Sequence, residues 1–230
     1  MIARGKVKLA AKGFLLVFLL CCSSLATAQN TTNQLWPEID YWIYFPDSWR
    51  LLLFGTVSRA RETPFLDGAL AGYIDNTIQT NSIAEGSSVI LRTGYMRVVT
   101  LTDTDERTHE NRLNLDAIPR VYLATDLLMS VRLRAELRWI EGDFSTRYRP
   151  RLRVEYPVIL EGRRFTPYLQ GEGYYDTRYD AWTRNTITGG VEIVLSYLFM
   201  LDVNFTRQTD VRDGSISHVN AIGLGLNIYQ

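Results

Sequence analysis

The segment from Ser130 to Tyr156 constrains the fold more than any other part of this chain, because polar and apolar residues alternate along two arms. The polar positions are Ser130, Arg132, Arg134, Glu136 and Arg138 in the first arm and Arg147, Arg149, Arg151, Arg153 and Glu155 in the second. A period of two is typical of β-strands, whose successive side chains point to opposite faces. Gly142-Asp143 between the arms predicts a two-residue hairpin turn with the glycine at positive φ. Each arm approaches the ~9–11 residues with which a tilted strand crosses a bilayer, so we expect two membrane-spanning strands.

The first 28 residues are typical of a secretory signal peptide. An apolar run from Gly13 to Cys22 is followed by a cleavage motif of small residues, Ala26-Thr27-Ala28, and preceded by the basic residues Arg4, Lys6, Lys8 and Lys12. A retained membrane helix is the alternative, but the apolar run is too short for one. We therefore expect cleavage before Gln29, which leaves residues 29–230 as one outer-membrane β-barrel domain.

Charge and cysteine content narrow the class of the mature protein. Cys21 and Cys22 both lie in the signal peptide, so the mature chain has no thiol, disulfide or cysteine ligand. The whole chain has 25 basic and 25 acidic residues, and removal of the four basic residues of the signal leaves 25 − 4 = 21 basic residues. A mildly acidic chain without a basic tail argues against a nucleic-acid partner.

Strand-like segments with turn residues between them fill the rest of the chain, and no segment after the signal has a helical period. A soluble periplasmic β-protein is one option. Strands that span lipid must instead form a closed barrel, because an open edge would leave backbone groups unpaired in hydrocarbon. Bacterial single-chain barrels have an even number of strands. We expect an all-β fold, a closed antiparallel transmembrane β-barrel of about 12 strands (10 to 12), although only eleven segments are recognisable: 35–45, 49–60, 67–79, 88–100, 107–117, 127–140, 144–156, 165–175, 183–196, 198–208 and 216–229.

Aromatic residues lie near the ends of the predicted strands. Rings at both ends of spanning strands form the interfacial belts of membrane barrels, although aromatics are also enriched in any β-protein. The predicted belts comprise Trp36, Trp42, Trp49, Trp139, Tyr156, Tyr175, Trp182, Tyr197 and Tyr229.

Several short motifs resemble the bacterial family labelled domain of unknown function 2490. They are Gln34-Leu35-Trp36-Pro37-Glu38, Arg132-x-Arg134-x-Glu136-x-Arg138, Arg147-x-Arg149-x-Arg151-x-Arg153-x-Glu155 and Tyr168-x-x-x-Glu172. The resemblance covers nearly the whole mature chain. It implies a small outer-membrane β-barrel without an assigned reaction.

The charged face of the hairpin is the strongest candidate for a functional site. If Glu141 pairs with Phe144, Arg138 opposes Arg147 and Glu136 opposes Arg149, and likewise Arg134 opposes Arg151 and Arg132 opposes Arg153. Seven arginines and two glutamates then give one face a net charge of +5. Like charges directly opposite are destabilising, so other strands must supply acids, and candidates are Glu110, Asp116, Glu172, Glu192 and Asp202.

Two roles for this face remain open. Arginine binds carboxylates with a planar fork and keeps its proton, which suits an ion-pair network that fills a narrow lumen. Rings of arginine also select anions in open pores. We prefer the network. The apolar residues of the opposite parity are expected to face lipid, and they include Val131, Leu133, Leu137, Leu152 and Val154.

Catalytic and metal-binding patterns are weak. His109 and His218 are the only histidines, and Ser217 adjoins His218 on a strand, where neighbouring side chains point apart. Asp103, Asp105 and Glu106 could bind calcium, but such a cluster is usually a solvated loop. Gly223-Leu224-Gly225 lacks the strand–turn–helix context of a nucleotide loop. We expect no enzyme activity, cofactor or metal, with an envelope lipid-modifying hydrolase or acyltransferase as the competing class.

The sequence therefore predicts a non-enzymatic barrel of the cell outer membrane, with a lumen that is largely plugged or forms a narrow passive channel. Expected partners are outer-membrane lipid, lipopolysaccharide and the barrel assembly machinery. Any small ligand is left open.

Overall fold

The computed structural model describes residues 31–60, 66–80, 86–101, 107–123, 126–212 and 214–230. The predicted signal peptide and its cleavage site lie outside these ranges. Within them no helix is long and apolar enough to cross a membrane. The regular elements are twelve strands: β1 Thr31–Tyr44, β2 Trp49–Ala60, β3 Leu66–Gln79, β4 Ser88–Leu101, β5 Arg107–Tyr122, β6 Leu128–Ile140, β7 Asp143–Glu155, β8 Val158–Leu160, β9 Arg163–Asp176, β10 Ala181–Val194, β11 Phe199–Arg212 and β12 Ser215–Tyr229.

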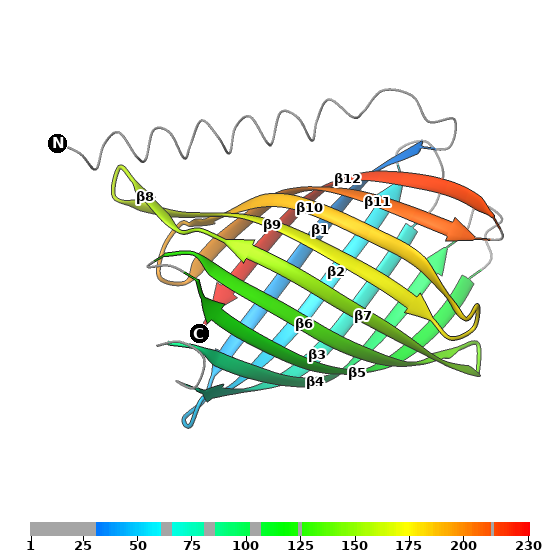
Figure 1. Cartoon of the computed structure of the whole chain (residues 1–230), viewed down its shortest axis with the longest axis horizontal. Coiled ribbons are helices and arrows are strands. Elements are labelled where there is room, and N and C mark those ends of the chain that lie inside the picture. The colour runs from blue at the N-terminus through cyan, green and yellow to red at the C-terminus, as the bar shows by residue number, and fades with distance from the viewer. Residues whose placement is uncertain (1–30, 61–65, 81–85, 102–106, 124–125, 213) are drawn as a thin grey trace. The chain divides into compact units, whose positions relative to one another are not determined.

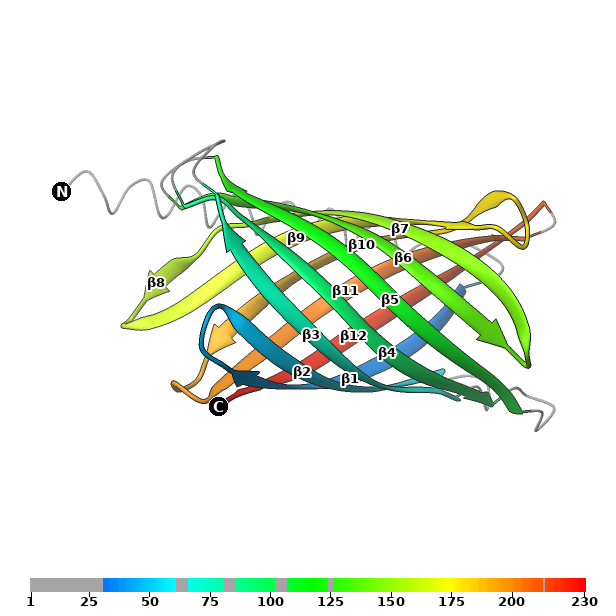
Figure 2. The same ribbon diagram turned by 90° about the horizontal axis from the view of Figure 1, so that it is seen from below.

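Eleven of these strands form the wall of a closed barrel, and they run obliquely to its long axis (Figures 1 and 2). Each of the eleven predicted segments overlaps one strand of the wall. The expectation of an all-β closed barrel of 10 to 12 strands is confirmed. The described residues contain twelve strands, the preferred number, but only eleven of them form the wall. The twelfth, β8, pairs only with β9.

The closure of the barrel departs from the fully antiparallel arrangement that we expected. Neighbouring strands are antiparallel except β1 and β12, which pair in parallel from Thr31 opposite His218 to Trp42 opposite Tyr229. An odd number of up-and-down strands necessarily brings the first and last strand together in the same direction. The prediction of an even, wholly antiparallel wall is therefore wrong at this one pair.

The short strand β8 continues β7 beyond the wall. Glu155 pairs with Tyr168 and Val158 pairs with Phe165, so both strands share one register with β9. Pro157 lies between them and has no backbone N–H to donate, which is a common reason for an interrupted ladder. In Figure 1 the β8–β9 hairpin extends past the neighbouring strands.

An apolar cluster lies inside the barrel along β2, β3 and β4. Leu52, Tyr73, Met96 and Val98 are buried together, and Trp42 packs against them. Trp42 therefore belongs to the interior and not to an interfacial belt, which corrects one of the predicted belt residues. Other predicted belt residues are exposed, including Trp49, Trp139, Tyr156, Trp182 and Tyr197.

A glycine on β4 makes room for the largest ring of this cluster. A Cβ atom on Gly94 would collide with the ring of Tyr73 and with the carbonyl oxygen of Gly72. The Tyr73 hydroxyl accepts a hydrogen bond from Asn114 (3.2 Å), which holds the ring in place.

Replacing Gly94 with alanine is expected to destabilise the barrel, because the ring and the β3 backbone must both shift. Overpacking of this kind costs about 1–3 kcal/mol. Urea unfolding of the detergent-folded protein measures the loss. Gly68→Ala is the control, since a Cβ atom at Gly68 meets nothing within 4 Å; equal losses for both variants would contradict this account.

Candidate functional site

The β6–β7 hairpin turns one residue earlier than predicted. Ile140 pairs with Asp143, so Glu141 and Gly142 form the turn, and both have positive φ (49° and 98°). Two central residues at positive φ are what a type I′ turn requires, and this turn matches the twist of the flanking strands. The predicted Gly142-Asp143 turn, with Glu141 opposite Phe144, is therefore wrong.

The corrected turn changes which charges oppose each other. Glu136 lies opposite Arg147 and Arg138 opposite Ser145, not opposite Arg149 and Arg147 as predicted. The other observed pairs are Arg134 with Arg149 and Arg132 with Arg151. A shift of two residues in the partner leaves every side chain on its predicted face, because only an odd shift exchanges the faces.

The charged positions are buried on β6 and buried or half-buried on β7, whereas the apolar positions of opposite parity are half-buried or exposed. Arg138 is 4% exposed and Glu136 0%, whereas Leu133 is 55% exposed. Charged side chains on the outer surface of a barrel would be accessible. These side chains therefore point into the barrel, and the leucines point outward.

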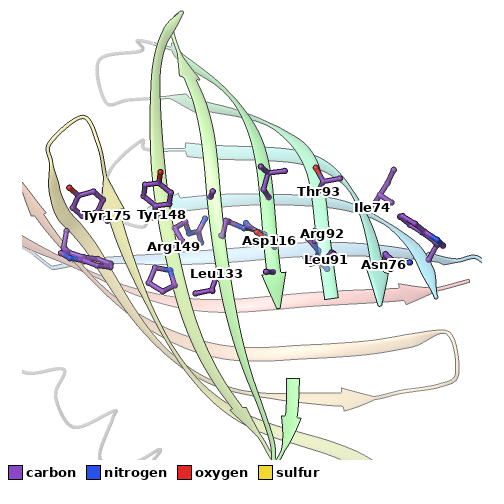
Figure 3. A pocket seen from close by; sticks show the side chains of 17 residues that line it. Ile74, Asn76, Leu91, Arg92, Thr93, Asp116, Leu133, Tyr148, Arg149 and Tyr175 are labelled. Carbon is purple, nitrogen blue, oxygen red and sulfur yellow. Dashed lines mark hydrogen bonds and ion pairs between the residues drawn. The ribbon is translucent and has the colours of Figure 1, made fainter. Parts of the chain in front are cut away.

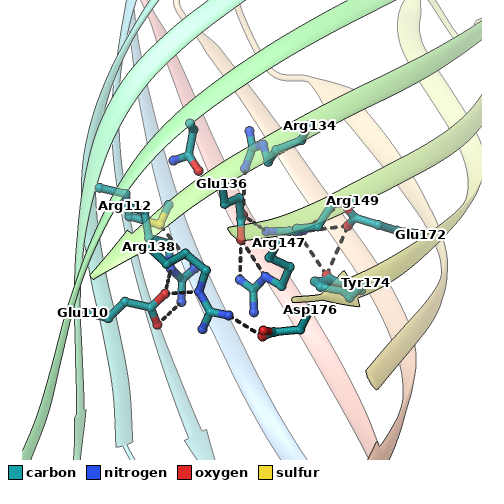
Figure 4. Close-up of polar contacts among 12 residues, drawn as sticks. Glu110, Arg112, Arg134, Glu136, Arg138, Arg147, Arg149, Glu172, Tyr174 and Asp176 are labelled. Atoms are coloured by element: carbon teal, nitrogen blue, oxygen red, sulfur yellow. Dashed lines mark hydrogen bonds and ion pairs between the residues drawn. The ribbon is translucent and has the colours of Figure 1, made fainter. Parts of the chain in front are cut away.

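Glu136 is the centre of the network (Figure 4). One carboxylate oxygen accepts from Nε of Arg147 at 2.6 Å and the other from Nη1 of Arg149 at 2.6 Å. Nη1 of Arg134 lies 3.9 Å from Oε1 of Glu136. A carboxylate without contact with water is thus matched by three guanidinium groups, two of them in direct contact.

A second carboxylate, Glu172 on β9, joins three arginine and tyrosine side chains. Arg149 donates to both of its oxygens at 3.1 Å, and Arg132 donates at 2.5 Å. The Tyr174 hydroxyl accepts from Arg149 and donates to Glu172. Glu172 therefore links β9 to both strands of the hairpin.

A third group forms at the turn end of β6. Arg138 donates to Glu110 on β5 and to Asp176 on β9, the latter at 2.5 Å. Arg112 also binds Glu110, at 2.7 Å. Sequence reasoning missed Asp176, because it lies one residue beyond the predicted strand 165–175, at the end of β9.

A row of alternating charges continues the network across five strands. Arg50, Asp75, Arg92, Asp116 and Arg134 are successive register partners on β2 to β6. Asp75 binds Arg50 and Arg92 at 2.8 and 2.7 Å, and Asp116 binds Arg134 at 2.7 Å. Opposite charges on directly opposed residues stabilise a sheet. Arg50, Asp75 and Arg92 were missed in the sequence analysis. Each is a charged residue within a largely apolar strand, and this pattern could have identified them.

The remaining ladder residues lie near the β8 end. Arg153 binds Glu155 at 2.9 Å and also Glu192, and its guanidinium lies 3.8 Å from the ring centre of Tyr168. Arg151 is different, since its side chain forms no hydrogen bond or ion pair with any residue that the structure describes. Asp202 was a candidate partner for the arginines, but it accepts hydrogen bonds from Tyr168 instead.

The other sequence candidates do not come together. His218 contacts Thr209 at 3.1 Å on β11, and His109 on β5 contacts Arg97. Gly223 and Gly225 lie within β12. Asp103, Asp105 and Glu106 fall outside the described residues. Among the residues that are described, no three His, Cys, Asp or Glu side chains are grouped to hold a metal ion.

A groove of about 940 Å³ lies along strands β2 to β7, β9 and β10 (Figure 3). Most of its exposed lining side chains are large and apolar, such as Ile74, Leu133 and Tyr148. Among its charged lining residues, Arg134 and Asp116 bind each other on the inner face. The groove therefore offers an apolar surface suited to hydrocarbon chains.

Comparison with known proteins gives a family but no activity. A family model described as a protein of unknown function (DUF2490) matches residues 75–217. No curated protein and no solved structure matches the chain.

Proposed function

The chain belongs to the DUF2490 family of proteins of unknown function, and we propose that it is a non-enzymatic β-barrel of the bacterial outer membrane whose lumen is closed by the arginine–carboxylate network. Its role in this proposal is structural. The proposal has two parts, a location in lipid and a closed lumen, and different observations support them.

The outer surface of the barrel supports the location. The strands of the wall have 12 to 16 residues, more than the ~9–11 that a tilted strand needs to cross a bilayer. Their outward positions carry exposed apolar side chains, among them Leu70, Ile74, Leu133 and Ile187. A soluble protein rarely exposes so continuous an apolar surface.

The burial of Glu136 is the observation that carries the closed lumen. A carboxylate that is 0% exposed and bound to two arginines leaves no water-filled path beside it. Six of the seven hairpin arginines have acid partners, supplied by β5, β6, β7, β9 and β10. Arginine side chains that are paired in this way are not free to attract anions passing through the lumen.

A passive anion-preferring channel is the second candidate, and the unpaired Arg151 favours it. The purified protein in planar bilayers separates the two. We expect no stable single-channel currents from the closed barrel, whereas steady anion-selective currents would establish the channel. Turnover of labelled phospholipid or lipopolysaccharide would point to the lipid-modifying enzyme instead.

The location has its own prediction. We expect Gln29 to be the mature N-terminus and the protein to fractionate with outer membranes. On gels, unboiled protein should migrate differently from boiled protein, as closed barrels do. Edman or mass-spectrometric analysis identifies the terminus, and release as a soluble protein by mild osmotic shock would overturn the proposed location.

A further inference from the structure

Carboxylates gather on one wall of the lumen, away from the network. Glu192 on β10 lies opposite Asp202 on β11, and Gly225 on β12 separates Asp202 from Glu38 on β1 in the same register row. Asp40 is two residues from Glu38 on the same face. Acids that oppose each other directly destabilise a sheet unless something neutralises them.

The described residues neutralise only part of this wall. Glu192 binds Arg153, and Asp202 accepts hydrogen bonds from Tyr168 at 3.0 Å. The side chains of Glu38 and Asp40 form no hydrogen bond or ion pair with residues that the structure describes, and Oδ1 of Asp40 is a buried oxygen without a partner. Unpaired buried oxygens are costly, so their presence calls for a partner.

On the opposite wall of the lumen, arginine donors lack described partners. Arg132 and Arg151 are directly opposed like charges. Arg132 is 7% exposed and binds Glu172 through Nη2, but its Nε has no partner, and neither has Nε of Arg151. Oε1 of Gln170 on β9, which can only accept a hydrogen bond, is also buried and unpaired.

The two walls lie on opposite sides of the lumen, because β6 and β7 are each five strands away from β1, counted in opposite directions around the closed wall. No ion pair joins Glu38 to Arg132 or Arg151. Glu38, Asp40 and Arg151 are half-buried, in contrast to Glu136 in the network. Half-buried acids on β1 therefore lie across the lumen from two arginines whose Nε atoms have no described partner.

We propose that this part of the lumen, the bipolar site of Glu38, Asp40, Asp202, Arg132, Arg151 and Gln170, binds a small zwitterion with an ammonium group at one end and an oxyanion at the other. The ammonium group donates to Glu38 and Asp40. The oxyanion accepts from the arginine guanidinium groups, whose geometry suits phosphate and carboxylate. A simple anion would be repelled by the acids and a simple cation by the arginines, so only a molecule with both charges is attracted at both ends.

Calorimetric titration of the detergent-folded protein with O-phosphoethanolamine tests the site. We expect saturable binding of one molecule, at least tenfold tighter than binding of ethanolamine or of inorganic phosphate alone. Glu38→Gln and Arg151→Gln should each weaken the binding at least tenfold. Asp210→Asn is the matched control, because Asp210 pairs with Arg184 at the far end of β11, and its binding should equal that of the wild type.

The stability of Arg151→Gln provides a second readout. Since Arg151 has no described acid partner and opposes Arg132, its replacement should leave the unfolding temperature unchanged or raise it, so weaker binding cannot be attributed to misfolding. Competition by phosphatidylethanolamine in vesicles of phosphatidylcholine would identify a lipid headgroup as the source, and lack of competition a free solute. Absence of saturable binding, equal binding of phosphate alone, or wild-type binding by Arg151→Gln would overturn the proposal. The test is independent of where the barrel resides, and so of the proposed location.

Discussion

Replacing Glu136 with glutamine is expected to lower the free energy of unfolding by about 3–5 kcal/mol, the cost of removing one partner from a buried ion pair. Glutamine keeps the size and one acceptor oxygen of the side chain. It removes the negative charge that Arg147 and Arg149 contact at 2.6 Å and that Arg134 approaches at 3.9 Å. Arg147 then has no acid partner among the residues that the structure describes, whereas Arg149 keeps Glu172 and Arg134 keeps Asp116.

Urea unfolding in detergent, or the temperature at which the folded gel band disappears, measures this effect. Asp210→Asn is the control, because it makes the same neutralising change in a pair whose arginine, Arg184, is 31% exposed. Pairs that water can reach contribute about 0–1 kcal/mol. If Glu136→Gln unfolds at the same urea concentration or temperature as Asp210→Asn, water screens the arginines and the network does not close the lumen.

Replacing Leu133 with arginine is expected to cost about 2–4 kcal/mol in a bilayer, the penalty for a basic side chain on the lipid face near the midplane. Leu133 is 55% exposed in the middle of β6, between Ala117 on β5 and Pro150 on β7. Water would accept an arginine there at little cost. The penalty therefore depends on hydrocarbon at this position.

Folding into lipid vesicles followed by urea titration measures the penalty. Ile216→Arg is the matched control, since Ile216 is also 55% exposed but lies at the beginning of β12. Near the interface the same change costs about 0–1 kcal/mol. Equal effects of the two substitutions, or a stable water-soluble Leu133→Arg protein, would count against a membrane-embedded wall.

The sequence by itself determined the strands of the wall and the two faces of the charged hairpin. Alternation is a local property, since each residue of a strand points opposite to its neighbour whatever the partner strand is. The same argument separated Arg134 from Leu133 without any knowledge of the register. The assignment of faces was correct although the predicted turn was wrong, because the observed register differs from the predicted one by two residues and not by one.

Register and pairing depended on the tertiary structure. The positive φ of Glu141 set which charges meet across the hairpin, and the acids that neutralise them come from strands distant in sequence, such as Asp176 on β9. The closure of β1 on β12 placed Glu38 across the lumen from Arg151, since β7 is five strands away from β1 around the wall. Such contacts depend on how many strands close the wall and in what register, which is a property of the whole barrel and leaves no trace in the period of any one strand.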